Sequence, residues 1–453
     1  MAQRMASTIP AAAGRVPERR ALIFALLAAT VSLPGAARAQ NLRKLANESE
    51  LTGDWGGART RLEDLGVKIA FEYWTNLAGN PVGGERQGFT YTDSLNLSID
   101  LDFQKLFAWK GGALHFIFTN RDGTSLSQND IGNIFTVQQI YGPTETYRLT
   151  ELTIEQSFDG GVFDVVAGRY PASDFATSPL YCVFMNNGFC GYPGGIAQNL
   201  NMPYFPVPSW AGRVRWKPSP EFLAQVGAFE VNPTLADTHG FDWSTSGGTG
   251  TAIVGELWYV RGGDAPGSPG HYKLGGWYQT QNAASLGPAS VQTAPNARPL
   301  LPSDSEEAFP RAVAPSVDAK AGFYALFDQA VTVTMPPIPF IRGAAEVPVG
   351  VTVLGGVSWA QGPSTVNNGA AFGGVILHDL IPSRPYDTQG FAATWVNRTA
   401  PGQTYELVLE WNYGIEVMRW FRFQPDVQWI IRPGATGQIP NALVLGAQAS
   451  IDF

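Results

Sequence analysis

The stretch "YELVLEWNYGIEVMRWFRFQPDVQWIIR", residues 405–432, contains two successive segments in which apolar and polar side chains alternate. In the first, the odd-numbered residues from Tyr405 to Val417 are apolar or aromatic, and most even-numbered residues are polar. The second, from Phe421 to Arg432, repeats the pattern. Alternation with period two predicts β-strands with one apolar face. Each segment is longer than a typical soluble strand and matches the roughly ten residues of a tilted strand that crosses a bilayer.

The same alternation recurs in "SLNLSIDLDFQ" (94–104) and in the last residues, "NALVLGAQASIDF" (441–453). Soluble antiparallel sheets also alternate, so the pattern by itself does not choose the environment. Long strands with a uniformly apolar face favour a transmembrane barrel, in which that face meets lipid and the polar face lines the lumen. Closure of the barrel also removes the free strand edges that lipid cannot hydrate.

Stretches with usable alternation number sixteen, an even number, as in single-chain bacterial barrels with an aqueous channel. We therefore predict an all-β, antiparallel outer-membrane barrel over residues 67–453. The predicted strands lie near residues 67–77, 92–104, 113–121, 148–158, 162–170, 209–216, 222–231, 251–260, 271–280, 320–330, 349–360, 371–378, 388–398, 405–417, 421–432 and 442–453. The last strand is expected to pair with the first and with 421–432.

The predicted connections alternate in length. The tight turns "WKGG" (109–112), "FDGG" (158–161) and "KPSPE" (217–221) belong on one rim, and the long segments 122–147, 171–208 and 281–319 on the other. Since only a long connection can fold back into a channel, 171–208 is the predicted constriction loop. Before the first strand, "GARTRLEDLG" (57–66) predicts a short helix that ends at Gly66.

The N-terminus has the pattern of a secretory signal peptide, residues 1–39. Arginines precede an apolar run of 13 residues, Ala21 to Leu33, and Ala37 and Ala39 form a small-x-small cleavage signature. The run is shorter than the roughly 20 residues that a transmembrane helix needs. Residues 40–66 are then a periplasmic N-terminal segment.

The composition limits the classes of partner. Charged residues make up 15% of the chain, against about a quarter in soluble domains. Cleavage after Ala39 removes five arginines and one glutamate, which leaves 25 basic against 37 acidic residues, or about net −12. This balance argues against nucleic acid as a partner.

Cys182 and Cys190 are the two cysteines of the chain. In an oxidising compartment they either close a small disulfide loop, which we favour, or remain as buried thiols. A Cys-x7-Cys pair without a neighbouring histidine cluster is a poor metal site, so we expect no metal and no cofactor.

Several separated motifs occur in a fixed order along the chain: "LTGDWGGARTRLEDLGV" (51–67), "YTDSLNLSIDLDFQKLFAWKGGALHF" (91–116), "YRLTELTIEQSF" (147–158), "AGRYPASDF" (167–175), "FPVPSWAGRVRWKP" (205–218), "YELVLEWNYGIEVMRWFRFQPDVQWIIRPG" (405–434) and "NALVLGAQASIDF" (441–453). In these motifs the chain resembles the carbohydrate-selective porins of the OprB family, from about residue 51 to the end. That resemblance implies a sixteen-stranded outer-membrane barrel of a Gram-negative-type bacterium that lets sugars or related polyols diffuse in.

A channel for sugars needs charged or amide groups that replace water on the hydroxyls. On the predicted strands Glu151 and Glu155 face the lumen, as do Arg213 and Arg215. Together with residues near them in sequence, they are the predicted contacts at the pore constriction: Arg148, Glu151, Glu155, Arg169, Asp174, Arg213 and Arg215. The alternative is that these charges only solvate the wall and pair for stability. Among the aromatic residues, Trp74 and Trp277 fall on inward positions, whereas most others are expected at the membrane interfaces.

Two other functions remain open on the sequence. The same fold could pass small organic acids, or a barrel enzyme could use the inward His115 beside a serine and an acid. The four histidines are scattered and no catalytic motif is present, so we predict no catalytic residue. The terminal Phe453 resembles the aromatic residue by which the outer-membrane assembly machinery recognises its clients. The expected partners are therefore sugars or polyols, outer-membrane lipid and that machinery.

Overall fold

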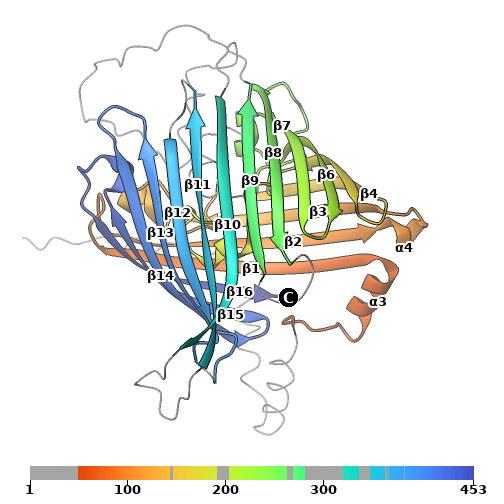
Figure 1. The fold of residues 1–453 in the computed structure, drawn as a ribbon, viewed down its shortest axis with the longest axis horizontal. Helices are drawn as coiled ribbons and strands as arrows, with labels where there is room; N and C mark the ends of the chain where they lie inside the picture. The colour runs from red at the N-terminus through yellow and green to blue at the C-terminus, as the bar shows by residue number, and fades with distance from the viewer. Residues whose placement is uncertain are drawn as a thin grey trace, which may run out of the picture. The chain divides into compact units, whose positions relative to one another are not determined.

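The computed structural model describes residues 49–142, 146–190, 204–262, 269–280, 320–335, 347–362, 365, 367–381 and 383–453. Within them, sixteen antiparallel strands form one closed barrel in which each strand pairs with its neighbours in the chain and β1 pairs with β16 (Figure 1). The strands are β1 (Val67–Val82), β2 (Phe89–Asp102), β3 (Gly112–Gly123), β4 (Tyr147–Phe158), β5 (Phe163–Tyr170), β6 (Ser209–Ser219), β7 (Phe222–Val231), β8 (Gly250–Arg261), β9 (Gly270–Gln279), β10 (Lys320–Met335), β11 (Val347–Gln361), β12 (Asn367–His378), β13 (Thr388–Arg398), β14 (Tyr405–Met418), β15 (Phe421–Ile431) and β16 (Ala442–Asp452).

All sixteen predicted strands are confirmed, and the differences concern their ends. β1 continues to Val82, beyond the predicted end at 77, because Gly79 still pairs with Phe89 and Val82 with Leu443. Backbone pairing extends this strand through residues whose side chains no longer alternate. The predicted signal peptide and the 281–319 loop lie outside the described residues.

The predicted helix before the first strand is α3 (Ala58–Leu65), and it ends at Gly66 as expected. Gly66 has φ 98°, and a Cβ there would lie 2.8 Å from the Lys105 Cβ, so both the conformation and the close approach require glycine. Within α3, the backbone N–H and hydroxyl of Thr60 donate to Asp54, which precedes the helix, and lower the pKa of its carboxyl. No helix in the described part of the chain is long and apolar enough to cross a membrane.

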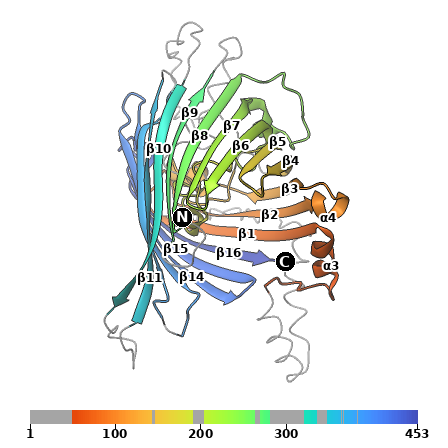
Figure 2. The same ribbon diagram turned by 45° about the vertical axis from the view of Figure 1, so that its right-hand side comes forward.

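The connections that follow β2, β4 and β6 lie at one rim, which also carries α3 and α4 (Phe103–Phe107) beside the C-terminus (Figures 1 and 2). Between β4 and β5 the chain turns within residues 159–162, and between β6 and β7 within 220–221. Since short turns face the periplasm in such barrels, this is the periplasmic rim. The connections 124–146, 171–208 and 232–249 belong to the external rim, in agreement with the predicted alternation of connection lengths.

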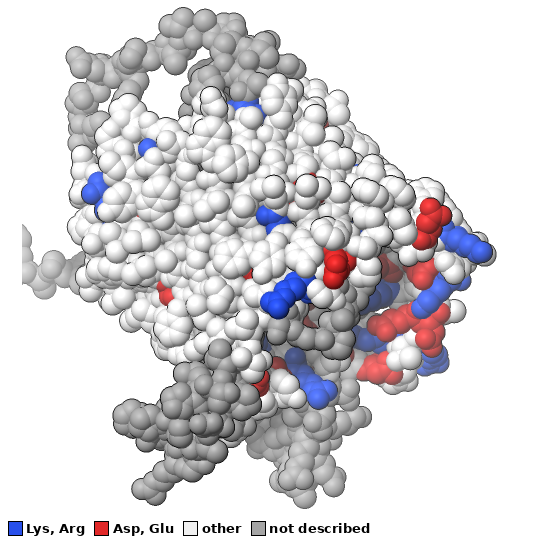
Figure 3. All heavy atoms as spheres, viewed as in Figure 1, with Lys and Arg blue, Asp and Glu red and all other residues white. Residues whose placement is uncertain are grey.

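The outer wall is apolar. Side chains at outward positions include Val214 and Trp216 on β6 and Leu274 on β9, all strongly exposed. Figure 3 shows few charged side chains over β8–β13, whereas charged residues gather at the rim that carries α3 and α4. A wall of exposed apolar side chains is stable only against lipid, so this band is the membrane-facing surface.

The barrel closes where the sequence predicted. β16 pairs with β15 and with β1, where Tyr73 lies opposite Ile451. The terminal Phe453 extends the seam because its N–H donates to the Phe71 carbonyl at 2.9 Å and its ring meets the Phe71 ring edge-on at 5.0 Å. The Arg59 guanidinium of α3 donates to the Phe453 carbonyl at 2.7 Å. The N-terminal helix therefore fastens the last residue of the chain.

Candidate functional site: the narrowed lumen

Two external connections fold back into the barrel. The first infolded segment, residues 124–142, contains the π-helix η3 (Ser127–Ile131). Its apolar side chains Leu126, Ile131 and Val137 are buried against the inner faces of β1 and β14–β16. This segment fills one side of the lumen, which the sequence analysis did not anticipate.

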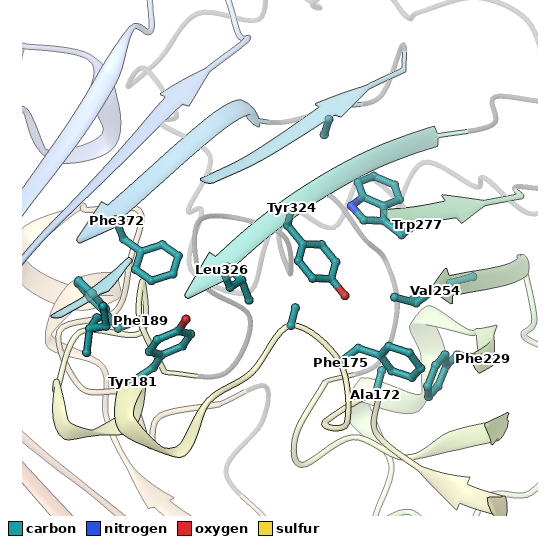
Figure 4. Packing of buried hydrophobic residues seen from close by; sticks show 14 of the residues in the cluster. Ala172, Phe175, Tyr181, Phe189, Phe229, Val254, Trp277, Tyr324, Leu326 and Phe372 are labelled. Carbon is teal, nitrogen blue, oxygen red and sulfur yellow. The ribbon is translucent and has the colours of Figure 1, made fainter. Parts of the chain in front are cut away.

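The second infolded segment, residues 171–190, is the described part of the predicted constriction loop. Its apolar side chains pack on the inner faces of β7–β13 (Figure 4). Tyr181 and Phe189 both meet Phe372 of β12 edge-on, at centroid distances of 5.3 and 5.1 Å, and Phe175 meets Phe229 of β7 at 5.9 Å. Each buried aromatic side chain contributes about 1.5 to 3 kcal/mol. The expectation that this connection narrows the channel therefore agrees with its packing.

The structure joins Cys182 and Cys190 in a disulfide. Both cysteines belong to the second infolded segment, which contains the 3-10 turn η4 (Pro179–Val183). The disulfide closes a loop whose aromatic residues Phe184 and Phe189 are almost fully buried. It therefore limits the conformations of the part of the segment that reaches deepest into the apolar cluster.

Inward carboxylates hold the infolded segments by their backbone N–H groups. Glu406 of β14 accepts from the N–H groups of Ile134 and Phe135 in the first segment. Four residues further along the same strand, Glu410 accepts from the N–H groups of Met185 and Asn186 in the second segment, at 2.6 and 3.0 Å. Buried backbone donors need such acceptors, and a carboxylate forms stronger hydrogen bonds than a neutral group.

The same two segments have their carbonyls bonded by inward amides. Asn412 and Gln424 both donate to the Val183 carbonyl, at 3.1 and 2.8 Å. Gln428 donates to the Val137 carbonyl at 3.0 Å. Donors and acceptors of the wall thus alternate to match the backbone of the segments, which fixes their position in the lumen.

A row of charged side chains lies on the opposite inner wall, across β2–β6. His115 of β3 lies 2.7 Å from Asp100 of β2 and 3.6 Å from Glu155 of β4. The next member is Arg213 of β6, whose guanidinium is 3.9 Å from Glu155. Glu155 and Asp100 are partly exposed to the lumen, so this wall is open to water where the infolded segments do not cover it.

The two arginines of β6 have different surroundings. Arg213 has 4% of its side chain exposed and lies between Asp164 of β5 and Asp174 of the second infolded segment, each at 2.6 Å. Arg215 has 27% exposed, contacts Asp164 only at 4.0 Å and donates to Gln225 at 3.3 Å. Arg213 therefore ties the infolded segment to the wall, while Arg215 keeps donors turned to the lumen.

The row continues beneath the second infolded segment. Gln225 of β7 donates to Glu256 of β8 at 2.9 Å, and the Tyr324 hydroxyl of β10 donates to the same carboxylate at 2.8 Å. Glu256 also accepts from the Ala176 N–H. Tyr324 can lie flat here because Gly275 of β9 has no side chain to oppose its ring. Glu256 is thus both a member of the charged row and an anchor of the segment.

The predicted site residues separate into two groups. Glu155, Asp174, Arg213 and Arg215 come together in the row described above, and Glu151 lies beside it, where its carboxylate accepts from the Thr153 hydroxyl. Arg148 lies apart from them: its guanidinium donates to the carbonyls of Thr238 and Ala236 in the β7–β8 connection.

Arg169 also lies apart from the row. It shares the outward parity of Phe163 and Val165 on β5, and its guanidinium lies over the ring of Trp210 on β6, 5.7 Å from the centroid. The sequence argument placed Arg148 and Arg169 near the others because they are close in the chain, yet strand parity and an external connection direct both elsewhere.

The inward carboxylates Glu256, Glu406 and Glu410 were not singled out from the sequence. A signal for their direction was present, since Glu406 and Glu410 occupy the polar positions of the alternating stretch 405–417. The sequence could not indicate that a distant segment would lie against them.

His115 lies between two carboxylates, those of Asp100 and Glu155. The hypothesis of a barrel enzyme requires a nucleophile–base pair, with a hydroxyl at hydrogen-bonding distance from this imidazole. Within the described residues, no group of three or more His, Cys, Asp or Glu side chains is arranged to hold a metal ion.

The comparisons with known proteins agree with this architecture. The family model of the carbohydrate-selective porin, OprB family, matches residues 86–453. Porin B of Pseudomonas aeruginosa is 30% identical over 441 residues, covering 90% of this chain and 92% of that protein. The high-pH structure of Pseudomonas putida OprB superposes with a TM-score of 0.74 at 27% identity, covering 90% of this chain and 99% of that one.

The low-pH structure of Pseudomonas putida OprB superposes with a TM-score of 0.57 at 22% identity and the same coverage. Family and fold both indicate a channel rather than an enzyme, and a barrel of this family spans the outer membrane. The chain therefore belongs to the OprB family of carbohydrate-selective porins.

Proposed function

We propose that this outer-membrane carbohydrate porin passes monosaccharides and related polyols by passive diffusion along the charged row of β2–β6. The observation that carries the proposal is the contrast between its two arginines. Arg215 presents donors to the lumen beside the acceptors Glu155 and Asp174, whose side chains are 29% and 31% exposed. Donors and acceptors side by side replace water on the hydroxyls of a neutral sugar without the tight binding that would slow its release.

Charge along the row favours neutral solutes over the organic acids considered above. The acidic side chains Asp100, Glu155 and Asp174 are all partly exposed, and of the two arginines of β6 only Arg215 is partly exposed, since Arg213 is covered by its two partners. A dicarboxylate would face excess negative charge in a narrow space of low dielectric, which costs far more than in bulk water. A sugar carries no such penalty.

The direct test is permeation through the purified barrel. We expect it to raise the conductance of planar bilayers and to make liposomes swell faster in glucose than in a disaccharide or a dicarboxylate of equal osmolarity. Equal rates for glucose and the dicarboxylate would contradict the preference for neutral solutes. Absence of both conductance and swelling would overturn the channel function itself.

The roles of the two arginines predict different variants. Arg215→Gln should lower the glucose swelling rate about threefold to tenfold, because a charged donor to hydroxyls is lost, and it should leave the thermal stability unchanged. Arg213→Gln is the matched control: it leaves Asp164 and Asp174 without their cation, so it should lower the unfolding temperature as well. Liposome swelling measures the glucose rate, and heat-modifiable migration on gels measures the stability. A loss of stability in the Arg215 variant alone would contradict the roles given to the two arginines.

Release of the second infolded segment should widen the channel. Glu410→Ala removes the acceptor of the Met185 and Asn186 N–H groups, which leaves buried donors unpaired and favours an open segment. We expect a larger single-channel conductance and faster passage of a disaccharide. Glu416→Ala, on the same strand, is the control, since among the described contacts its side chain holds neither infolded segment. An unchanged conductance in Glu410→Ala would mean that the apolar packing alone keeps the segment in place.

The role of Phe453 in assembly is also part of the proposal. Deleting Phe453 should lower the amount of barrel in the outer membrane, because the assembly machinery loses its recognition residue. Arg59→Ala separates recognition from stability, since it removes the hydrogen bond to the Phe453 carbonyl and keeps the residue. For both variants and the wild type, the measurements are the level of barrel in the outer membrane and the yield of refolding into liposomes that lack the assembly machinery. A deletion that reaches normal outer-membrane levels would count against this role.

A further inference from the structure

Trp74 faces the lumen from the middle of β1. Its neighbours across the sheet are Ser94 of β2 and Ser450 of β16. The next inward residue towards the external rim, Asn76, is fully buried and donates to Gln448, and the Asn76 carbonyl accepts from Gln138 of the first infolded segment. Trp74 is only half-buried. It therefore lies where the filled part of the lumen ends, on its periplasmic side.

The indole of Trp74 makes no specific contact among the described residues. Within this part of the chain, Trp74 has no hydrogen bond, ring contact or cation partner, whereas Trp277 is buried and Trp258 has a cation partner. Trp277 is 4% exposed within the apolar cluster, and one face of Trp258 is covered by the Lys273 ammonium at 3.5 Å from its centroid. Part of this large apolar ring stays exposed at an inward position, where a solute in the lumen can contact it.

Polar groups surround the ring on the periplasmic side. Glu72, one inward position further along β1, is exposed and lies opposite Asn96 of β2 and Asp452 of β16. An aromatic face bordered by carboxylate and amide oxygens matches a pyranose, which has an apolar ring face and hydroxyls at its edges.

We propose that Trp74 is the platform of a second carbohydrate subsite, which an entering sugar meets before it reaches the charged row. The pyranose ring stacks on the indole, and Glu72 and Asn96 bond its hydroxyls. This inference rests on the proposed function, since it requires that sugars pass. The inward residues of β2 connect the two regions, because Asn96 and Asp100 lie on the same face of that strand, and Asp100 begins the charged row.

The subsite is tested by binding in planar bilayers, measured as the glucose concentration that half-saturates the reduction of ion current. Trp74→Ala should raise this concentration about threefold to tenfold, the range expected for loss of an aromatic stacking contact. Trp74→Phe, which keeps a ring, should lie between this variant and the wild type. The acyclic hexitol mannitol has no ring face, so its half-saturating concentration should stay the same in all three proteins.

Trp216→Ala is the control, since that side chain is exposed on the lipid-facing wall, and it should bind glucose as the wild type does. An unchanged half-saturating concentration for glucose in Trp74→Ala would overturn the subsite, as would an equal change for mannitol, which would indicate only a wider channel. If the wild type itself shows neither current reduction nor swelling in glucose, the proposed sugar permeation fails, and this result is distinct from a failure at Trp74 alone.

Discussion

The hydrocarbon core of a bilayer offers no hydrogen-bond partner to a peptide group, and this constraint determines the rest of the structure. Every strand in the barrel must find two neighbours, so the first and last strands have to meet. The seam between β1 and β16 meets this requirement. The seam also includes Phe453, whose N–H bonds to the Phe71 carbonyl and whose own carbonyl accepts from Arg59 of α3.

Peptide groups inside the lumen also need hydrogen-bond partners. Two segments of irregular backbone enter the barrel, and most of their surroundings exclude water. On strands β14 and β15, inward carboxylates accept from the N–H groups of these segments, and inward side-chain amides donate to their carbonyls. The aromatic residues of the second segment then pack on β7–β13, so that the charged wall of β2–β6 stays accessible. The side on which we propose that solutes pass therefore depends on where the segments are attached.

The sequence was sufficient for the architecture because alternation records which face of each strand meets lipid. It identified sixteen strands, the closing pair, and the inward direction of Glu155, Arg213 and Arg215. It was insufficient wherever the position depends on a contact between distant segments. Nothing in the sequence of 124–142 distinguishes an external loop from one that lies in the lumen.

Two of the proposed site residues fail for a more local reason. Arg169 follows the parity of β5 and faces outward, and Arg148 lies beyond an irregularity in the β3–β4 pairing. There the external part of β4 bonds to the β7–β8 connection. Residues that are close along a strand need not be close in space, because a shift of one residue places a side chain on the opposite face of the sheet.

The manner in which the infolded segments are attached bears on how such a channel can evolve. Glu406, Glu410 and Glu256 bind the backbone N–H groups of Ile134, Met185 and Ala176, and not their side chains. Backbone groups are common to all residues except proline at the donor position. Substitutions in these segments can therefore alter the solute preference while the attachment persists, so that one scaffold can give rise to relatives with different permeants.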